Sequence, residues 1–192
     1  SKTRSWKGLQ PPGLPGSAQT GNAAGVLCLF EAAGLGGLLD TGLINAAWSS
    51  LSLPGRMQSI SAERNWLLDV AHNPAAAEAL AASLLEQPFA GKTIAMIAML
   101  DDKDVEACVR PLAPIVDQWI AFTAQSPRAI PVRELARRIA NASGTACLEA
   151  VSPEDAMAFA SEYSTLEDRI LVTGSFFSVS PVLKALELYS RR

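Results

Sequence analysis

The chain has 192 residues and a formal net charge of −3, and 49% of its residues are hydrophobic. This length and composition predict a globular protein with one complete α/β domain, or with one domain and part of another. The negative charge argues against a nucleic-acid partner, which would need clustered Lys and Arg. We also expect no membrane partner, because no apolar run is long enough to span a bilayer and no signal sequence is recognisable at the start.

The cysteines and the single histidine bear on compartment and metal binding. Cys28, Cys108 and Cys147 are far apart in the sequence and form no CxxC pair, which favours buried free thiols in a reducing cytosol. We therefore expect a cytoplasmic protein, and we take a monomer as its expected state. With His72 as the only histidine, no motif for the usual Cys/His zinc site is present, so a metal would need carboxylates or a ligand phosphate.

The first part of the chain predicts two helices after a turn-rich start of about fifteen residues. Residues 22–33 (NAAGVLCLFEAA) indicate a buried helix that stops at Gly34, and residues 40–50 indicate a second, short helix. Pro54 and Gly55 then interrupt the pattern and predict a hinge.

The rest of the chain alternates between strand and helix patterns. The strand candidates are MQSIS (57–61), WLLDV (66–70), TIAMIAML (93–100), QWIAFTA (118–124), TACLEA (145–150) and RILVTG (169–174). The helical patterns cover residues 74–86, 104–115, 131–141, 153–163 and 179–190. This rhythm predicts a Rossmann-like, mainly parallel sheet with helices on both faces. The first two strands are too close for a crossover helix, so we expect them to pair antiparallel.

Three loops follow the carboxyl ends of strands, where open parallel sheets bind ligands. The first loop, 69–74, ends in Asn-Pro, a favourable helix start; an alternative is that its polar residues only hold a turn. For LDDKD (100–104), helix capping is favoured over a ligand role for its lysine. In TGSFFS (173–178), the glycine lets the backbone approach a ligand, and free N–H groups at the following helix would favour an anion.

Motifs for phosphate binding or hydrolysis are incomplete. Residues 16–23 (GSAQTGNA) have the glycine spacing of a P-loop but lack its Lys-Ser/Thr, and the GKT at 91–93 lacks the first glycine. No GxSxG motif is present, so a serine hydrolase is not supported.

Five motifs occur in an order that resembles one enzyme family. They are NAAGVLCLFEAAGL (22–35), LPGRMQ (53–58), LLDVAHNPAAAEAL (67–80), IAMLDDKD (97–104) and VTGSFFSV (172–179). The set resembles the folylpolyglutamate synthase and dihydrofolate synthase branch of the Mur ligase superfamily. The D-x-A-H-N-P motif alone is shared with the peptidoglycan ligases of that superfamily, and the other motifs favour the folate branch.

The resemblance implies an ATP-dependent amide ligase that adds L-glutamate to dihydropteroate or a folate through an acyl phosphate. Enzymes of this family are about twice as long and begin with an ATPase domain that carries the P-loop and the Mg²⁺ ligands. The chain is therefore expected to hold the end of the ATPase domain and a linker (1–53), followed by the Mur-ligase-type C-terminal domain (54–192). On its own it is expected to be inactive.

The resemblance also implies roles for individual residues. Asn22, Arg56 and Asp69 are expected to face the nucleotide, where the planar guanidinium of arginine suits phosphate. Asp69 suits a ribose hydroxyl or the orientation of Arg56. His72 and Ser175 are expected to be catalytic and to bind the incoming glutamate, with added charge from Lys103.

Two other functions stay open from the sequence. One is a Mur-type ligase that acts on a UDP-linked peptide precursor. The other is a stand-alone nucleotide- or amino-acid-binding module without catalysis. The substrate profile of the complete gene product separates the first from the folate ligase, and the coding sequence upstream of Ser1 separates the second.

Overall fold

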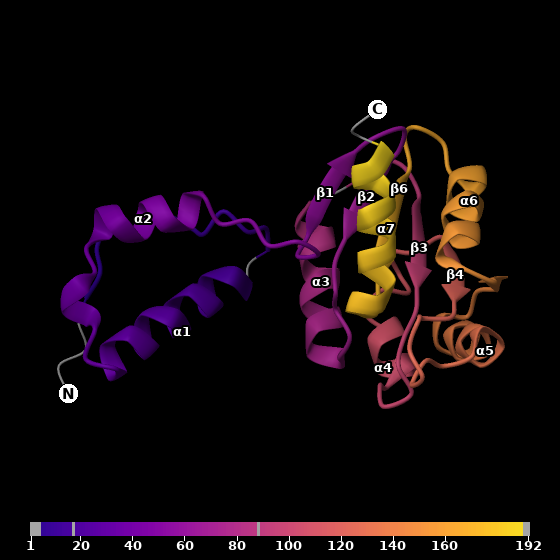
Figure 1. Ribbon diagram of the computed structural model, residues 1–192, viewed down its shortest axis with the longest axis horizontal. Coiled ribbons are helices and arrows are strands. Elements are labelled where there is room, and N and C mark those ends of the chain that lie inside the picture. Colours follow the sequence, from indigo (N-terminus) through magenta and orange to yellow (C-terminus); the bar gives the residue numbers. More distant parts are fainter. Residues whose placement is uncertain (1–4, 17, 88, 190–192) are drawn as a thin grey trace. The chain divides into compact units, whose positions relative to one another are not determined.

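The computed structural model describes residues 5–16, 18–87 and 89–189. The chain divides into two compact units, Ser1–Leu53 and Pro54–Arg192, and each is described by itself. Figure 1 labels the helices and strands of both units.

The first unit contains α1 (Ala18–Ala32), a 3-10 turn η1 (Gly36–Leu38) and α2 (Thr41–Ser49). Asp40 caps α2 by accepting a hydrogen bond of 2.9 Å from the Leu43 amide. The segment before α1 is tied to α2, because the Gly13 amide donates to the Trp48 carbonyl at 2.9 Å. Hydrogen bonds therefore hold the start of α2 and attach the preceding segment to its end.

The helix expected over residues 22–33 is present, but the expectation that it is buried is wrong. Helix α1 begins four residues earlier, and Leu29 and Val26 are 70% and 47% exposed, whereas Ala23 and Leu27 are buried. A helix that is apolar all round needs partners on every side, whereas its exposed side chains show that α1 is covered only in part. The unit thus has apolar surface without a complete core.

The second unit is built on a six-stranded sheet (Figure 1). Its strands are β1 (Gln58–Ser61), β2 (Asn65–Leu68), β3 (Thr93–Ile97), β4 (Gln118–Phe122), β5 (Cys147–Ala150) and β6 (Arg169–Thr173). The order is β1-β2-β6-β3-β4-β5, with β1 antiparallel to β2 and every other pair parallel. The predicted fold class, including its single antiparallel strand, is confirmed.

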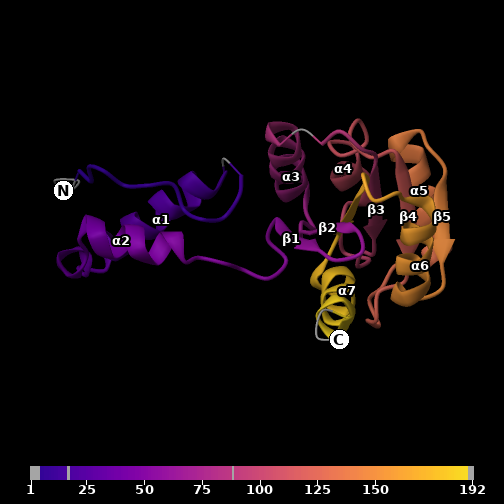
Figure 2. The ribbon, with the colours of Figure 1, turned by 90° about the horizontal axis from the view of Figure 1, so that it is seen from above.

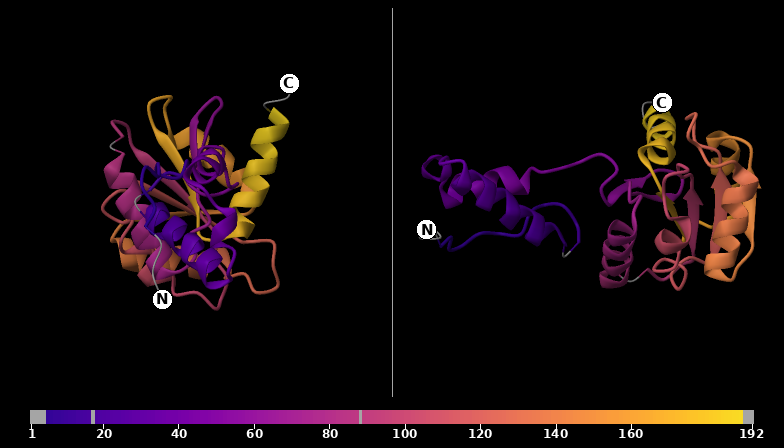
Figure 3. Two further views of the ribbon diagram at one scale, coloured as in Figure 1. Left: turned by 90° about the vertical axis from the view of Figure 1, so that its left-hand side faces the viewer. Right: turned by 90° about the horizontal axis from the view of Figure 1, so that it is seen from below.

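Helices cover both faces of the sheet. They are α3 (Pro74–Glu86), α4 (Val105–Val109), α5 (Val132–Ser143), α6 (Pro153–Tyr163) and α7 (Phe176–Tyr189). Side chains of β3 alternate between two cores: Ala95 and Ile97 pack with α3, α4 and α5, whereas Ile94 and Met96 pack with α6 and α7. Figure 2 and the right-hand panel of Figure 3 show α3 and α7 on opposite sides of the sheet.

Prolines account for the largest difference from the predicted helices, and the last helix differs at its start. Helix α4 ends at Val109, although its pattern continues to residue 115, because Pro111 and Pro114 cannot supply helical N–H groups. Helix α7 begins at Phe176, earlier than expected, and contains Pro181. The predicted end of that helix, Ser190, lies outside the described residues. Among the described residues, the helices are too short or too polar to cross a bilayer.

The cysteines differ in exposure. Cys108 is buried, Cys147 is half-buried and Cys28 is exposed, and all three are free. The expected burial is therefore wrong for Cys28, which lies on the incompletely covered α1. Burial raises the pKa of Cys108 to about 11 and that of Cys147 to about 12, so these two thiols stay protonated at neutral pH.

Candidate functional site

The three loops singled out from the sequence lie at one edge of the sheet, because β2, β6 and β3 are neighbours. The Gly174 amide donates to the Ala71 carbonyl at 3.0 Å, which ties the loop after β6 to the loop after β2. The Ser175 hydroxyl lies 2.9 Å from the Ala98 carbonyl, which ties the same loop to the end of β3. Hydrogen bonds thus join the loops that carry His72 and Ser175.

Asp69 locks the loop that carries Arg56, residues 54–58, which we call the Arg56 loop. One oxygen of the Asp69 carboxylate accepts the Met57 amide at 2.9 Å, and the other accepts the Ala71 amide at 2.9 Å. The Val70 amide also donates to the Gly55 carbonyl at 2.9 Å. The backbone is therefore held on both sides of Arg56.

The Arg56 loop has an unusual backbone. Gly55 and Met57 have φ values of 69° and 45°, so Arg56 stands between two left-handed residues. A non-glycine residue in this region costs of order 1–3 kcal/mol and persists only where the surroundings enforce it. Here the bond from the Met57 amide to Asp69 provides that constraint.

The two charged side chains at this site, Asp69 and Arg56, differ in their partners. Asp69 is only 7% exposed, and its burial raises the pKa of its carboxyl group, against the opposing effects of the Met57 and Ala71 amides and the charge of Arg56. Arg56 is half-buried, and its guanidinium forms no ion pair among the described residues. The arrangement leaves a cation able to bind an anion.

His72 has one ring nitrogen engaged and one available. Its Nδ1 lies 2.9 Å from the Val70 carbonyl oxygen. A carbonyl can only accept, so Nδ1 carries the proton of this bond. Nε2 then accepts a hydrogen bond when the ring is neutral and donates one when it is protonated, and it makes no hydrogen bond to a described residue.

The start of α3 fixes the position of His72. Asn73 is the N-cap and accepts the Ala76 amide at 2.9 Å, and Pro74 occupies the first turn. The predicted Asn-Pro cap is confirmed. Because Asn73 is the next residue, the cap also limits where the imidazole can lie.

Ser175 is more enclosed than expected for a substrate-facing residue. Its hydroxyl is buried, lies 2.8 Å from the Ser178 hydroxyl, and accepts the Ser178 amide at 3.1 Å as a cap of α7. Gly174 has a φ of 101°, and a Cβ there would lie 2.7 Å from the Ala98 carbonyl oxygen. The hydrogen bond from the Ser178 amide shows that Ser175 caps α7. Contact between Ser175 and the substrate stays a prediction.

The loop of residues 100–104, which we call the Lys103 loop, pairs its lysine with its own Asp102. Lys103 Nζ lies 2.7 Å from an Asp102 oxygen, and Arg128 lies 3.7 Å from the other. Asp104 caps α4 by accepting the Ala107 amide at 3.0 Å. The capping interpretation of this loop therefore holds, and the substrate role of Lys103 stays a prediction.

Asn22 lies in α1 of the first unit, where its side-chain amide donates to Gln19 at 3.2 Å. It is exposed, and its nucleotide role also stays a prediction.

Two residues of the site were not identified from the sequence. Met57 belongs to the LPGRMQ motif, but nothing in a methionine indicates a left-handed backbone. Ser178 is fully buried and bonded to Ser175. Its position three residues after Ser175 could have indicated the contact, because residues i and i+3 share one face of a helix.

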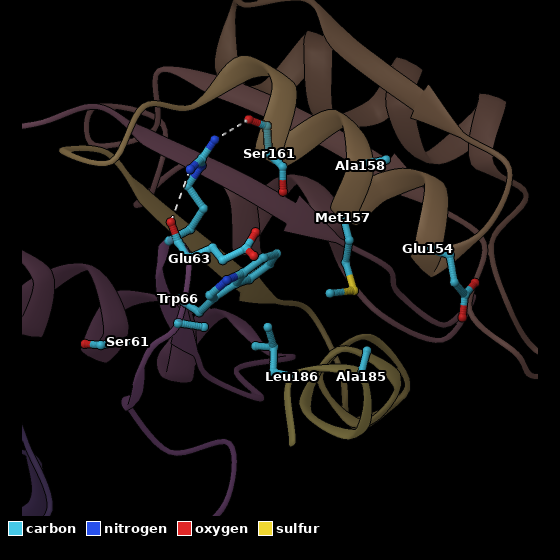
Figure 4. Close-up of a pocket in the computed structure, with 11 residues that line it drawn as sticks. Ser61, Glu63, Trp66, Glu154, Met157, Ala158, Ser161, Ala185 and Leu186 are labelled. Atoms are coloured by element: carbon cyan, nitrogen blue, oxygen red, sulfur yellow. Dashed lines mark hydrogen bonds between the residues drawn. The ribbon is translucent and has the colours of Figure 1, made fainter. Parts of the chain in front are cut away.

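The described residues contain no group of three or more His, Cys, Asp or Glu side chains able to bind a metal. A cavity of about 750 Å³ lies between the β1–β2 hairpin, α6 and α7 (Figure 4). None of the predicted site residues lines it, and the Arg64 guanidinium there donates to the Glu63 and Ser161 carbonyls. This arginine therefore connects the hairpin to α6. Because the cavity holds none of the predicted site residues, we place the candidate site at the carboxyl ends of the strands.

The chain is similar to known enzymes of one family. Residues 55–176 match the family model described as Mur ligase, glutamate ligase domain. The dihydrofolate synthase/folylpolyglutamate synthase of Escherichia coli (strain K12) is 34% identical over 166 residues, which are 86% of this chain and 38% of that enzyme. The chain therefore spans well under half the length of this relative.

Solved structures agree with the sequence matches. E. coli FolC in complex with DHPP and ADP is 30% identical, with a TM-score of 0.79, over 97% of this chain and 42% of that one. A bifunctional folylpolyglutamate synthase/dihydrofolate synthase with Mn, AMPPNP and L-glutamate bound is 32% identical, with a TM-score of 0.80, over 97% and 43% of the two chains.

Proposed function

Because the chain belongs to the Mur ligase family and carries its glutamate ligase domain, we propose that it is part of an ATP-dependent ligase that joins L-glutamate to dihydropteroate or a folate. The names of the similar enzymes favour this substrate class over a UDP-linked peptide. Residues 54–192 are proposed to form the C-terminal domain. Residues 1–53 are proposed to be the end of the ATPase domain and the linker.

The proposal rests on two groups at the carboxyl ends of the strands. Among the described residues, the Arg56 guanidinium has no ion pair and the His72 Nε2 has no hydrogen bond. Asp69 and Val70 hold the Arg56 loop. His72 lies two residues beyond Val70 with Nε2 available. Such an edge suits one anionic and one amino-acid ligand.

Arg56 fits a nucleotide, because a guanidinium that forms no ion pair among the described residues can donate several charge-assisted hydrogen bonds to phosphate. ATP, when bound, supplies the phosphoryl group that activates the carboxylate as an acyl phosphate. Asp69 keeps the Arg56 loop in shape and has lone pairs left for a ribose hydroxyl. Asn22 is proposed to face the same nucleotide. The Mg²⁺ ligands are proposed to lie outside this chain.

The glutamate side of the site is assigned to His72 and Ser175. In the protonated ring His72 Nε2 donates to a glutamate carboxylate, and in the neutral ring it accepts from the amino group. Ser175 adds a hydroxyl beside it, and Lys103 adds charge at the neighbouring loop. The chain thereby holds glutamate in position for attack, and positioning of this kind can account for roughly 7–11 kcal/mol of a reaction barrier.

The test is glutamate kinetics in the full-length parent protein, followed by ADP release with dihydropteroate, folate and a UDP-linked peptide as alternative acceptors. His72→Ala should raise the KM for glutamate at least about tenfold and leave the KM for ATP unchanged. Arg56→Ala should instead weaken ATP use.

Arg137→Ala, at an exposed ion pair within α5, is the matched control and should leave both KM values unchanged. Normal glutamate kinetics in the His72 variant would contradict the role of the histidine. A preference for the UDP-linked peptide would contradict the substrate class, and turnover by the 192-residue chain alone would show that it needs no other part.

A further inference from the structure

The buried hydroxyl of Ser175 raises a question for the proposed function. A serine hydroxyl has one proton, and in this structure the acceptors within reach of it are the Ala98 carbonyl at 2.9 Å and the Ser178 hydroxyl at 2.8 Å. If the proton turns toward a substrate carboxylate, the Ala98 carbonyl loses that bond. Ala98 is fully buried, and an unpaired buried carbonyl is costly.

Ser178 can prevent that loss. Its own hydroxyl lies 3.1 Å from the Ala98 carbonyl oxygen and 3.1 Å from the Ser175 carbonyl oxygen. The Ala98 carbonyl therefore has two hydroxyl groups within hydrogen-bond distance, and one proton is enough to satisfy it. With Ser178 donating to Ala98, Ser175 can release its proton to another acceptor without leaving a buried group unpaired.

The side chain of Ser178 is not needed for the helix itself. The cap of α7 is made by the Ser178 backbone amide, which donates to the Ser175 hydroxyl at 3.1 Å. Alanine at position 178 would keep this amide and so keep the cap. Ser178 is also fully buried, where a polar side chain without a use is unfavourable.

We propose that Ser178 is a positioning residue, whose hydroxyl takes over the Ala98 carbonyl and thereby lets Ser175 donate its proton to the carboxylate of the incoming amino acid. This inference rests on the proposed function, in which Ser175 binds glutamate. Ser178 does not touch the substrate, and its effect passes entirely through Ser175.

The experiment measures glutamate and ATP kinetics of four variants in the full-length protein. Ser178→Ala should raise the KM for glutamate about tenfold and leave the KM for ATP unchanged. Ser178→Thr, which keeps the hydroxyl, should restore most of the glutamate affinity. Adding Ser178→Ala to Ser175→Ala should have no further effect, because both act through one hydrogen bond.

Ser83→Ala is the matched control. Ser83 is also buried, and its hydroxyl donates to the Ala79 carbonyl at 2.8 Å in α3. The Ser83→Ala variant should leave the KM values for glutamate and for ATP unchanged. If Ser178→Ala does not fold, as judged by thermal unfolding, Ser178→Cys replaces it, because a thiol has nearly the same shape and donates only weakly.

The outcomes separate the two proposals. If Ser175→Ala raises the KM for glutamate and the Ser178 variants do not, the positioning role is overturned and the function stands. If Ser178→Ala changes both KM values equally, its role is structural and the inference is also overturned. If Ser175→Ala has no effect on glutamate, the assignment of Ser175 fails in the proposed function itself.

Discussion

The Arg56 loop and the Lys103 loop lie by the same sheet, and each has a cation near a carboxylate, but the two carboxylates have different partners. Next to the Arg56 loop, the carboxylate of Asp69 is buried, and its partners among the described residues are backbone amides. Arg56 has no ion pair there among the described residues. In the Lys103 loop, the Asp102 side chain is 45% exposed and pairs with both Lys103 and Arg128.

The difference suggests which loop is built to meet a ligand. A carboxylate bonded to amides fixes the shape of its loop and leaves the neighbouring cation able to attract an anion. A carboxylate paired with lysine cancels that charge, and an exposed pair of this kind adds only about 0–1 kcal/mol of stability. The two loops therefore differ in whether their cation forms an ion pair among the described residues, rather than in the number of charges.

The largest expected effect comes from breaking the backbone of the Arg56 loop. Gly55→Ala should lower the free energy of unfolding by about 4 kcal/mol. Two causes add: Gly55 has a φ of +69°, and a Cβ there would lie 2.9 Å from Val70 Cγ1 and 3.1 Å from Val179 Cγ1. Urea denaturation of the chain measures the change.

Gly144→Ala separates these two causes. Gly144 has a similar φ of +75°, and nothing lies within 4 Å of its added Cβ. It should lose only about 1 kcal/mol, which is the backbone contribution. Equal losses at both glycines would mean that the tight packing around Gly55 contributes nothing to the loop.

The next largest effect is expected when an aspartate is replaced by alanine beside the Arg56 loop, compared with the same replacement in the Lys103 loop. Asp69→Ala should cost about 2 kcal/mol, because the buried Met57 and Ala71 amides lose their acceptor, partly offset by removal of a buried charge. Asp104→Ala removes only the cap of α4 and should cost about 1 kcal/mol. Denaturation of both variants gives the difference, and a smaller loss at Asp69 would refute its role as the lock of the Arg56 loop.

Most of the fold could be predicted from the sequence because its signals are local. Near-continuous apolar runs such as β3 and β6 identify central strands, and the Asn73–Pro74 start identifies α3 within one residue. The burial of α1 could not be predicted in the same way. An apolar helix indicates that a partner is needed, but not which segments cover it.

The site was predictable as a set of loops but not as a network of bonds. Sequence motifs identified the residues at the sheet edge, including His72 and Ser175. They did not reveal that Asp69 bonds to the Met57 amide twelve positions earlier, or that Ser178 shares an acceptor with Ser175. Such contacts depend on the register of neighbouring strands and the shape of the turns, which arise only when the sheet forms.

The smallest expected effect concerns an ion pair of α4, the helix that follows the Lys103 loop, and it is tested through its pH dependence. Glu106, in α4 after the Lys103 loop, binds Arg138 of α5 through two hydrogen bonds. Bonding to Arg138 lowers the pKa of Glu106 from 4.5 to about 2. The folded state thus binds this proton less tightly than the unfolded state, so the stabilisation is complete above pH 4.5 and is lost as the pH falls toward about 2.

Glu106→Gln should therefore reduce the free energy of unfolding by about 1 kcal/mol at neutral pH, and the gap between wild type and variant should close as the pH falls through that range. Glu134→Gln removes the more exposed pair with Arg137, so it should change stability less at neutral pH. Urea denaturation at a series of pH values measures both gaps. A gap for Glu106 that stays constant down to about pH 2 would mean that the pair contributes packing rather than charge.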